Sequence, residues 1–429
     1  MALERINFPS PVAEGTPQAA YAAVPDGSMA RGSAWALTRT PPNLTIFTGS
    51  DSPQGVALGK TAKSVDQNSQ NATCSIAADS YWVTPNAQNQ ANRTRRLNYQ
   101  RSAAKLLPGS RVANCLWAVA SMADGVEVIH NPKAAKSRFT GLQTCGSPWP
   151  CPCCSATISD RRRMELNDLL AWARANGYAP VLMSLTARHS QKDKLPDLLE
   201  ALKKAKQRLA QRREWRALDL VGSVTATEVT GGGLHGWHPH FHVLLLVEAS
   251  TEAEAVASVE KLRAAWMACL KGVGLSGAGA AFDVQGAASA GNYVAKWGAA
   301  EELALGDRKK GRHGRTPMQL LQDYTDAADE TAGQLFTEFA KTFKGRRQLV
   351  WSRGLKALAG IEEKSDERVA EEAVKRAEEA EDETTMATFS KVEWRSVRAH
   401  RAQVLQASEH SPAGLARLIK SIEKKEATP

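Results

Sequence analysis

Long apolar runs are absent from this sequence of 429 residues. No stretch of about 18 consecutive apolar residues occurs, so the sequence predicts no helix that spans a membrane. The first residues, MALERINFPSPVAEG, also lack a basic start followed by an apolar segment, which argues against a secretory signal peptide. From both absences we expect a cytoplasmic protein without a membrane partner.

Cysteine is rare and unevenly placed. Seven cysteines occur, four of them between positions 145 and 154, a distribution that favours a metal cluster in a reducing compartment over a disulfide framework. The C-x2-C spacing of Cys151 and Cys154 lets two thiolates bind one tetrahedral zinc ion, and Cys145 and Cys115 can complete a four-sulfur site. Cys153 can replace Cys115 in that set. In the alternative interpretation, these residues are small buried hydrophobic side chains.

Acidic residues are outnumbered by basic ones. The 55 lysines and arginines exceed the 45 aspartates and glutamates, which gives a formal charge of +10 and a pI of about 9.2 and weakly favours a polyanionic partner. Residues 1–109 are rich in small and polar side chains over most of their length, so we expect a disordered, low-complexity arm. Its basic end, from Arg93 to Lys105, is either a DNA-contacting arm or a solvated linker.

Three histidines lie within five residues: His238, His240 and His242. The apolar run Val243–Val247 that follows them predicts a buried β-strand, and the two-residue period of a strand places all three imidazoles on one face. Neutral imidazole is a common ligand of divalent metals, so this face is a candidate metal site. In the alternative interpretation, the histidines belong to a core strand and bond to the backbone.

A second strand is expected to pair with the histidine strand. Residues 218–230 have the composition of a strand, and Gly231–Gly233 allow the chain to turn back into the histidines. Antiparallel pairing brings Glu228 beside His240 and His242, where its carboxylate completes a set of oxygen and nitrogen ligands suited to Mg²⁺ or Mn²⁺. Otherwise Glu228 is a charged residue at a sheet edge.

The stretch GWHPHFHVLL resembles the HUH endonuclease superfamily, whose defining strand carries two histidines flanking one bulky hydrophobic residue, here His240-Phe241-His242. In its fuller form it looks like the version found in rolling-circle plasmid replication initiators. The resemblance implies an α+β fold with a central antiparallel sheet, the histidine strand at its middle and flanking helices mainly on one side. It also implies a metal-dependent DNA nickase in which Glu228, His240 and His242 hold the metal, with His238 as a further candidate ligand.

The same resemblance implies a nucleophilic tyrosine, and Tyr293-x-x-Lys296 looks like the tyrosine motif of these initiators. It follows the histidine strand by one predicted helix and one predicted strand, the order that the family uses. A phenol is a poor nucleophile until its anion is stabilised, and Lys296, one helical turn away, is placed to do that or to hold the phosphate. Attack on a DNA phosphodiester leaves a 5′-phosphotyrosine link and a free 3′-OH that primes synthesis.

One position departs from the family pattern. Some single-tyrosine members carry a glutamate four residues before the tyrosine, which activates water in the terminating step, and this chain has Ser289 there. Glu301, Glu302 or a second subunit's tyrosine are the alternatives for that step. Similar initiators also carry a cysteine-rich segment before the catalytic domain, which supports a structural zinc site whose ligands are Cys115, Cys145, Cys151 and Cys154.

Two basic stretches are candidates for DNA contacts. The first is a loop that can clamp DNA phosphates and contains Arg308, Lys309, Lys310 and Arg312. In the second, Arg346 and Arg347 lie close to Trp351, and basic residues interleaved with an aromatic suit a groove for single-stranded DNA. In the alternative interpretation, Trp351 is a core residue.

These features predict four regions: the arm 1–109, a zinc-binding segment 110–178, a nickase domain 179–360 and a charged helical extension 361–429. We expect a short hairpin within 111–131, strands at 180–188 and 282–287, and helices at 161–176, 196–216, 251–274 and from 289 onward. The expected partners are double-stranded and single-stranded DNA at a plasmid origin, with a host helicase and polymerase. A conjugative relaxase or single-strand transposase would use the same chemistry, although no P-loop and no second nearby tyrosine are present. A non-catalytic zinc and DNA-binding regulator is the remaining alternative.

Overall fold

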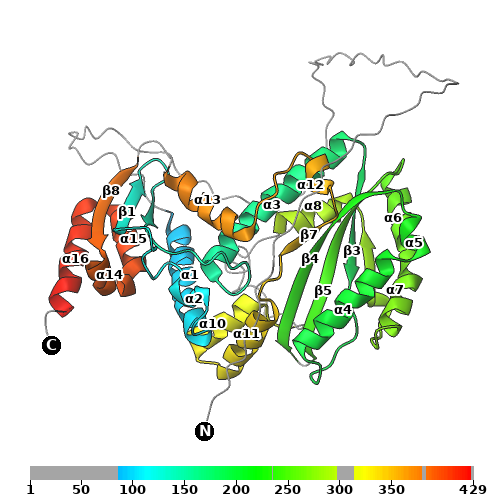
Figure 1. The fold of residues 1–429 in the computed structure, drawn as a ribbon, viewed down its shortest axis with the longest axis horizontal. Coiled ribbons are helices and arrows are strands. Elements are labelled where there is room, and N and C mark those ends of the chain that lie inside the picture. The colour runs from blue at the N-terminus through cyan, green and yellow to red at the C-terminus, as the bar shows by residue number, and fades with distance from the viewer. Residues whose placement is uncertain (1–85, 234, 297–313, 379–382, 427–429) are drawn as a thin grey trace, which may run out of the picture. The chain divides into compact units, whose positions relative to one another are not determined.

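The described part of the chain is a mixed α/β structure with two antiparallel sheets (Figure 1). This computed structural model describes residues 86–233, 235–296, 314–378 and 383–426. None of the described helices is long and apolar enough to cross a membrane.

The larger sheet has five strands in the order β6-β3-β5-β4-β7, and every neighbouring pair is antiparallel. Its strands are β3 (Ala179–Leu185), β4 (Leu220–Gly233), β5 (Gly236–Val247), β6 (Phe282–Gln285) and β7 (Leu349–Trp351). Strand β5, which carries the histidines, lies in the middle, as the family resemblance implies.

A hairpin between β4 and β5 sets the register of the histidine strand. Gly232 and Gly236 have φ angles of +72° and +78°, in the left-handed region that favours glycine. At Gly236 a Cβ atom would lie 2.7 Å from the carbonyl oxygen of Ser190, so the close approach of the two backbones also requires glycine. The resulting register pairs Glu228 with His240.

Helices cover both faces of this sheet, so the expectation of helices mainly on one side is wrong. On one face α4 (Leu195–Ala210), α6 (Glu252–Glu260) and α7 (Leu262–Lys271) pack on Phe241, Val243 and Leu245 of β5 (Figure 1). The other face carries α3 (Pro152–Ala175) and α8 (Ala287–Lys296), which pack with Leu244 and Leu246. The apolar run after His242 has no polar face, and such a strand must be buried on both sides.

Short helices and the pair α10 and α11 complete this part of the structure. Helix α10 (Pro317–Ala327) begins with a capping box between Thr316 and Gln319, and Asp329 caps α11 (Glu330–Thr342). The other helices here are α2 (Arg111–Asn114), α5 (Arg213–Arg216), α12 (Leu355–Leu358), α13 (Asp366–Glu378) and the 3₁₀ turn η1 (Gly279–Ala281).

The smaller sheet has three strands in the order β2-β1-β8: β1 (Gly125–Asn131), β2 (Lys136–Thr140) and β8 (Thr384–Ser390). It shares a core with α14 (Lys391–Val397), α15 (Arg401–His410) and α16 (Pro412–Glu426), and η2 (Arg398–His400) links the first two of these helices. Phe389 and Trp394 from the C-terminal region pack there with Val126 and Val128. The region 361–429 is therefore not a purely helical extension, because β8 completes a sheet begun by β1 and β2.

Ordered structure also begins earlier than predicted. Residues 87–106, expected to belong to a disordered arm, form helix α1 (Ala87–Leu106), on which Tyr99 and Ala103 are buried. Arg401 of α15 is 3% exposed and donates to the carbonyl oxygens of Leu97 and Leu116 at 2.7 and 2.6 Å. The helix escapes prediction because its buried face is made largely of small and polar residues. Residues 1–85 of the expected arm lie outside the described residues.

Candidate active site and cysteine cluster

Glu228, His240 and His242 come together on one face of the larger sheet. The Oε2 atom of Glu228 lies 3.3 Å from His240 Nε2 and 3.5 Å from His242 Nε2. One ligand atom from each residue lies within 4.8 Å of the others, so the group could hold a metal ion. The carboxylate and imidazole donors are of the type that Mg²⁺ and Mn²⁺ accept.

The second nitrogen of each imidazole has a partner of its own. His242 Nδ1 lies 2.9 Å from Ser184 Oγ on the neighbouring strand β3, and His240 Nδ1 lies 3.4 Å from the His238 carbonyl oxygen. Such contacts fix the ring so that Nε2 faces the ligand position. Ser184 was not predicted from the sequence, because its place opposite His242 follows only once β3 is paired with β5.

His238 does not belong to this group of ligands. Its Nε2 atom lies 3.0 Å from Thr186 Oγ1, and its ring packs against His189 at a centroid distance of 4.7 Å. The strand period correctly places His238 on the same face as His240 and His242. His238 lies four residues before His242, however, so it contacts Thr186 and His189 instead of the Glu228 group.

The carboxylate of Glu228 is held in its charged form by the two histidines. Burial raises the pKa of Glu228, but hydrogen bonds from His240 and His242 outweigh burial and hold this pKa well below its ordinary value. An ionised carboxylate beside two imidazoles is a suitable donor set for a hard divalent cation.

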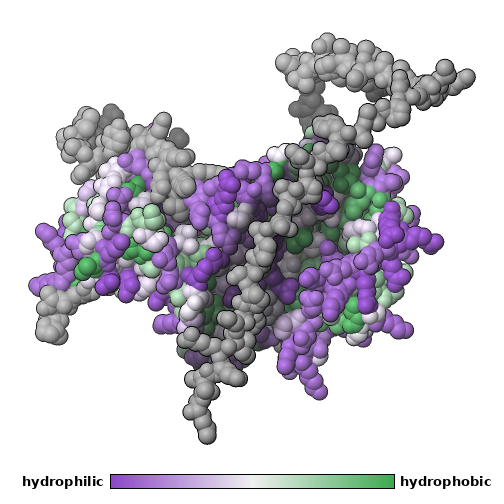
Figure 2. Space-filling view, in the orientation of Figure 1, coloured by the Kyte–Doolittle hydropathy of each residue, from purple (hydrophilic) through white to green (hydrophobic). Residues whose placement is uncertain are grey.

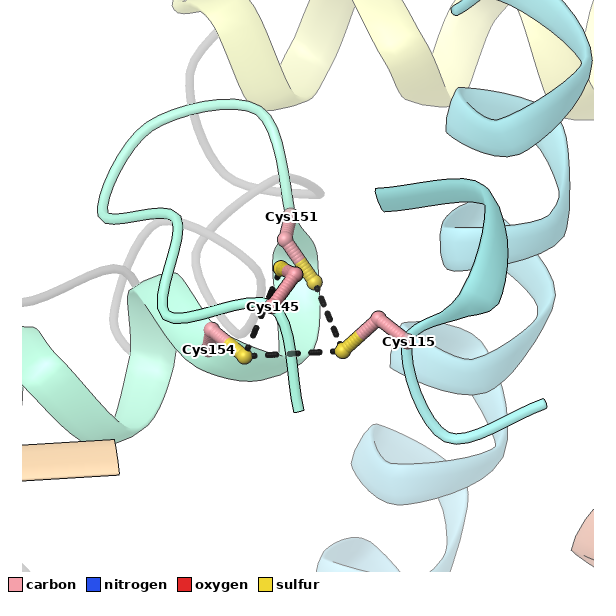
Figure 3. Close-up of side chains that lie close together, drawn as sticks. All are labelled: Cys115, Cys145, Cys151 and Cys154. Atoms are coloured by element: carbon pink, nitrogen blue, oxygen red, sulfur yellow. Dashed lines mark hydrogen bonds between the residues drawn. The ribbon is translucent and has the colours of Figure 1, made fainter. Parts of the chain in front are cut away.

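Four cysteines form a second, buried group that could hold a metal ion (Figure 3). The Sγ atom of Cys115 lies 3.5 Å from those of Cys151 and Cys154, and Cys145 Sγ lies 3.6 Å from Cys154 Sγ. Four sulfurs at ~2.3 Å from one zinc ion in tetrahedral geometry are about 3.8 Å apart, so the four thiols fit such an ion.

The local backbone explains which cysteines take part. Gly146, after Cys145, has a φ of +57°, and the next amide, of Ser147, donates to Cys145 Sγ at 3.4 Å. Cys151 and Cys154 lie at the start of α3, while Cys115 follows α2. Cys153 lies outside the group, with its Sγ atom 3.7 Å from the Arg96 carbonyl oxygen.

Helix α8 packs on the face of the sheet that carries the histidines. Ala290 of this helix is fully buried and packs in one core cluster with Leu182 of β3 and Leu244 of β5. Side chains two residues apart on β5 share a face, so Leu244 and His242 lie on the same side of the sheet. Tyr293 follows Ala290 by one helical turn, and Lys296 ends the helix.

The basic residues predicted to contact DNA fall into two groups. Arg308, Lys309, Lys310 and Arg312, together with Glu301 and Glu302, lie outside the described residues. Arg347 is exposed, and its Nη1 atom lies 3.7 Å from Glu363 Oε1. Arg346 Nε donates to the Thr342 carbonyl oxygen at 2.9 Å. Trp351 is half-buried, with part of its ring packed against the core under α3.

One family model and two known proteins match the chain. A family model described as replication protein matches residues 136–402. The chain is 30% identical to "Protein rep" of Streptomyces lividans over 317 residues, which covers 56% of this chain and 68% of that protein. It is 32% identical to a "Neomycin resistance protein" of Streptomyces cyanogenus over 143 residues, or 27% of this chain and 32% of that protein. No solved structure matches the chain.

The family match includes the residues of both candidate metal groups other than Cys115, and it extends into α15 of the C-terminal region. It therefore spans the larger sheet together with β8 of the smaller sheet. Because the match covers more than half of the sequence, the chain belongs to the replication protein family of plasmid replication initiators.

Proposed function

We propose that this protein initiates rolling-circle plasmid replication by nicking one DNA strand at the origin. The observation that carries the proposal is the joint placement of Glu228, His240 and His242 on one face of the sheet, with α8 packed on that face. In this account the sheet is an HUH endonuclease sheet, and β5 at its centre is the defining histidine strand.

Tyr293 supplies the attacking oxygen. Its phenolic oxygen forms a bond to phosphorus while the bond from phosphorus to the 3′ oxygen breaks. The phenol loses a proton and the departing 3′ oxygen gains one, which leaves a 5′-phosphotyrosine and a free 3′-OH for a host polymerase. Lys296, one turn further along α8, favours the phenolate or holds the phosphate.

Each candidate metal group has a distinct role in this proposal. Glu228, His240 and His242 would hold Mg²⁺ or Mn²⁺, which supplies Lewis acidity toward a phosphate oxygen when bound. Ser184 keeps His242 turned toward Glu228. Cys115, Cys145, Cys151 and Cys154 would hold a structural zinc ion that fastens the start of α3 to the segment after α2.

The test is incubation of the protein with supercoiled plasmid that carries the plasmid's own replication origin. We expect open circles with covalently attached protein, and we expect chelation to abolish them and Mg²⁺ or Mn²⁺ to restore them. His240→Ala and His242→Ala should each remove nicking while the circular dichroism spectrum stays unchanged. His410→Ala, at an exposed position on α15, is the matched control and should nick normally. Full nicking by either active-site variant would contradict the proposal.

A further inference from the structure

A large groove lies beside the edge strand β7 of the larger sheet. Its volume is about 1520 Å³, above the roughly 300–1,000 Å³ of ordinary small-molecule sites. The walls come mainly from residues 106–112, the loop between Cys145 and Cys151, the segment that joins α11 to α12, Ile361 and residues 363–367. Its size suits a segment of a polymer better than a single small metabolite.

One wall of this groove is strongly basic. Residues 341–353 contain five cations and no acidic residue: Lys341, Lys344, Arg346, Arg347 and Arg353. Four of them, all but Arg346, are exposed, and among the described residues only Arg347 has an acidic partner within 4.0 Å, the exposed Glu363. This wall, called the basic wall below, therefore offers positive charge to a ligand.

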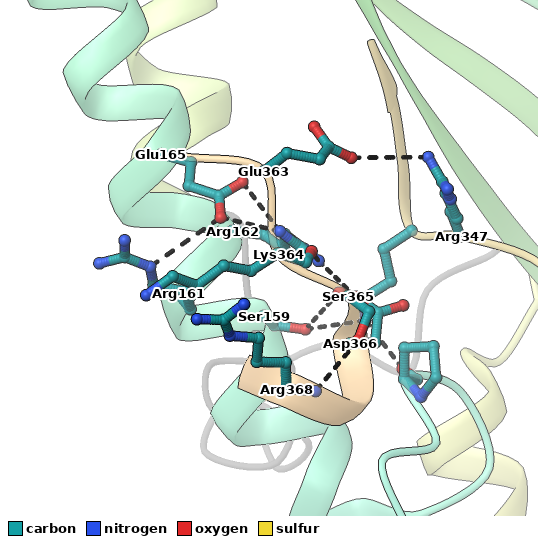
Figure 4. A network of polar contacts seen from close by, with 12 residues as sticks. Ser159, Arg161, Arg162, Glu165, Arg347, Glu363, Lys364, Ser365, Asp366 and Arg368 are labelled. Atoms are coloured by element: carbon teal, nitrogen blue, oxygen red, sulfur yellow. Dashed lines mark hydrogen bonds and ion pairs between the residues drawn. The ribbon is translucent and has the colours of Figure 1, made fainter. Parts of the chain in front are cut away.

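The opposite wall is charged but internally neutralised (Figure 4). Arg162 bonds to Glu165 at 2.8 Å and to Asp366 at 2.7 Å, and Lys356 bonds to Glu165 at 3.0 Å. These pairs are buried, with side-chain exposures of 13% or less, so their cations are already satisfied. A polyanion in the groove would therefore be attracted mainly by the basic wall.

Strand register connects the groove to the candidate active site. Ala226 of β4 pairs with His242 of β5 on one side and with Leu349 of β7, which lines the groove, on the other. Directly paired residues project from the same face, so His242 and Leu349 are two strand spacings, about 10 Å, apart on one surface. Because β7 is antiparallel to β4, the chain before Leu349 continues toward the end of β4 that carries Glu228.

The cysteine loop holds the basic wall in place. Trp149, between Cys145 and Cys151, donates its indole N–H to the Arg346 carbonyl oxygen at 2.7 Å and packs on Phe343 at a centroid distance of 4.6 Å. Gln348 donates to the Pro148 carbonyl oxygen at 2.8 Å. The loop that the cysteine cluster closes is thus bonded to the segment that carries the cations.

From these observations we infer that the groove binds single-stranded DNA next to the phosphate that is cut, through the basic wall. Phosphates contact the cations of 341–353, while the apolar surfaces of Trp149, Trp351 and the nearby prolines accept unpaired bases. A recessed, partly apolar groove fits a single strand better than a duplex, whose bases are already stacked and paired. The inference rests on the proposed function in its choice of DNA as the polyanion and in taking the phosphate near His242 as the one that is cut.

The test compares two triple variants by fluorescence anisotropy with a labelled 20-nucleotide oligothymidine, which contains no origin. The groove variant is Lys344→Gln, Arg347→Gln and Arg353→Gln, three exposed positions of the basic wall. The control variant removes the same charge from α4 and α7 on the opposite face of the sheet: Lys203→Gln, Lys204→Gln and Lys271→Gln. Figure 2 shows that the outer surface over α4 is also hydrophilic, so the control removes cations from a comparable surface.

We expect the groove variant to bind the oligonucleotide about tenfold or more weakly, and its log–log salt slope to fall by about 2, at ~0.7 per lost phosphate contact. The control variant should bind as the unchanged protein does. Equal losses in the two variants would overturn the inference, as would an equal loss for a duplex of the same length. Origin nicking is measured in parallel. If the unchanged protein nicks but the groove variant binds the oligonucleotide as tightly as it does, the inference about the groove is wrong and the proposed function stands. If the groove variant binds more weakly but the unchanged protein does not nick, the proposed function is wrong and the inference that the groove binds single-stranded DNA stands.

Discussion

Ser184 on β3 and His242 on β5 lie directly opposite one another, and Ser184 Oγ is 2.9 Å from His242 Nδ1. The contact turns His242 Nε2 toward Glu228, so Ser184 acts as a positioning residue. We predict that Ser184→Ala lowers the affinity for Mn²⁺ by about tenfold, the lower end for losing such a partner. Isothermal titration calorimetry on the protein without DNA measures this affinity. Ser258→Ala, whose hydroxyl bonds only within helix α6, is the control; equal affinities in the two variants would remove Ser184 from this role.

The cysteine cluster predicts different outcomes for neighbouring cysteines. Cys151→Ser should lose the bound zinc and increase proteolysis between 115 and 160, because the metal contributes folding energy there. Cys153→Ser changes the thiol between Cys151 and Cys154 in sequence but outside the group of four, and should keep one zinc ion per chain. Metal analysis of protein purified without chelator decides between them. Zinc retained by Cys151→Ser but lost by Cys153→Ser would show that the ligand set is wrong.

The buried ion pair between Arg93 and Glu409 should make the stability of the fold depend on pH. Burial raises the pKa of Glu409, but hydrogen bonds from Arg93, the Ser137 amide and Gln90 outweigh it and hold this pKa below its ordinary value of 4.5. Because the folded-state pKa is the lower one, the carboxylate stabilises the fold above pH 4.5, and this contribution disappears as the pH falls through the folded-state pKa.

Glu409→Gln should therefore lower the free energy of unfolding by about 2 kcal/mol at pH 7, the range for hydrogen bonds to a charged group. Urea unfolding followed by circular dichroism should show this difference shrinking as the solution is made more acidic than pH 4.5. Glu423→Gln, at an exposed position on α16, should change stability by less than about 0.5 kcal/mol. A Glu409→Gln deficit that does not vary with pH would contradict the role given to its charge.

If Lys296 acts in the nicking step, its substitution should slow nicking without weakening DNA binding. Lys296→Ala should slow nicking about 10²-fold, in the range for losing one positioned electrostatic contact, while origin DNA binds as before. Lys296→Arg keeps the positive charge and should recover part of the rate. Single-turnover nicking separates the two steps, and an unchanged rate in the alanine variant would exclude Lys296 from the chemistry.

The histidine strand was predictable because its signal is local. Three alternating histidines before an apolar run, and a glycine turn before them, determine both the strand and the pairing of Glu228 with His240, and the structure confirms this register. Ser184 could not be found this way, since its role depends on which strand lies on the other side of β5. The cysteine spacing likewise left Cys115 and Cys153 as alternatives, and only the fold separates them.

The C-terminal region illustrates why long-range pairing is hard to predict. Strand β8 pairs with β1 across more than 250 residues of sequence, and within it only Phe389 is buried, so it shows no alternating pattern. Helix α1 was missed for a related reason: its buried Gln100 is satisfied by the Val112 carbonyl oxygen and by Arg401, partners far apart in the sequence. A polar side chain that is buried by contacts with residues elsewhere in the sequence is expected to be exposed when only its own segment is considered.

The covalent link to Tyr293 tests the central claim most directly. Trypsin should release residues 272–296 as one peptide, because no lysine or arginine lies between Lys271 and Lys296, and its one tyrosine is Tyr293. After reaction with origin DNA and nuclease digestion, mass spectrometry should find the nucleotide on this peptide, and Tyr293→Phe should bind DNA yet form no adduct. A nucleotide on the peptide 316–341, which contains Tyr324, or an adduct formed by the phenylalanine variant, would contradict the assignment.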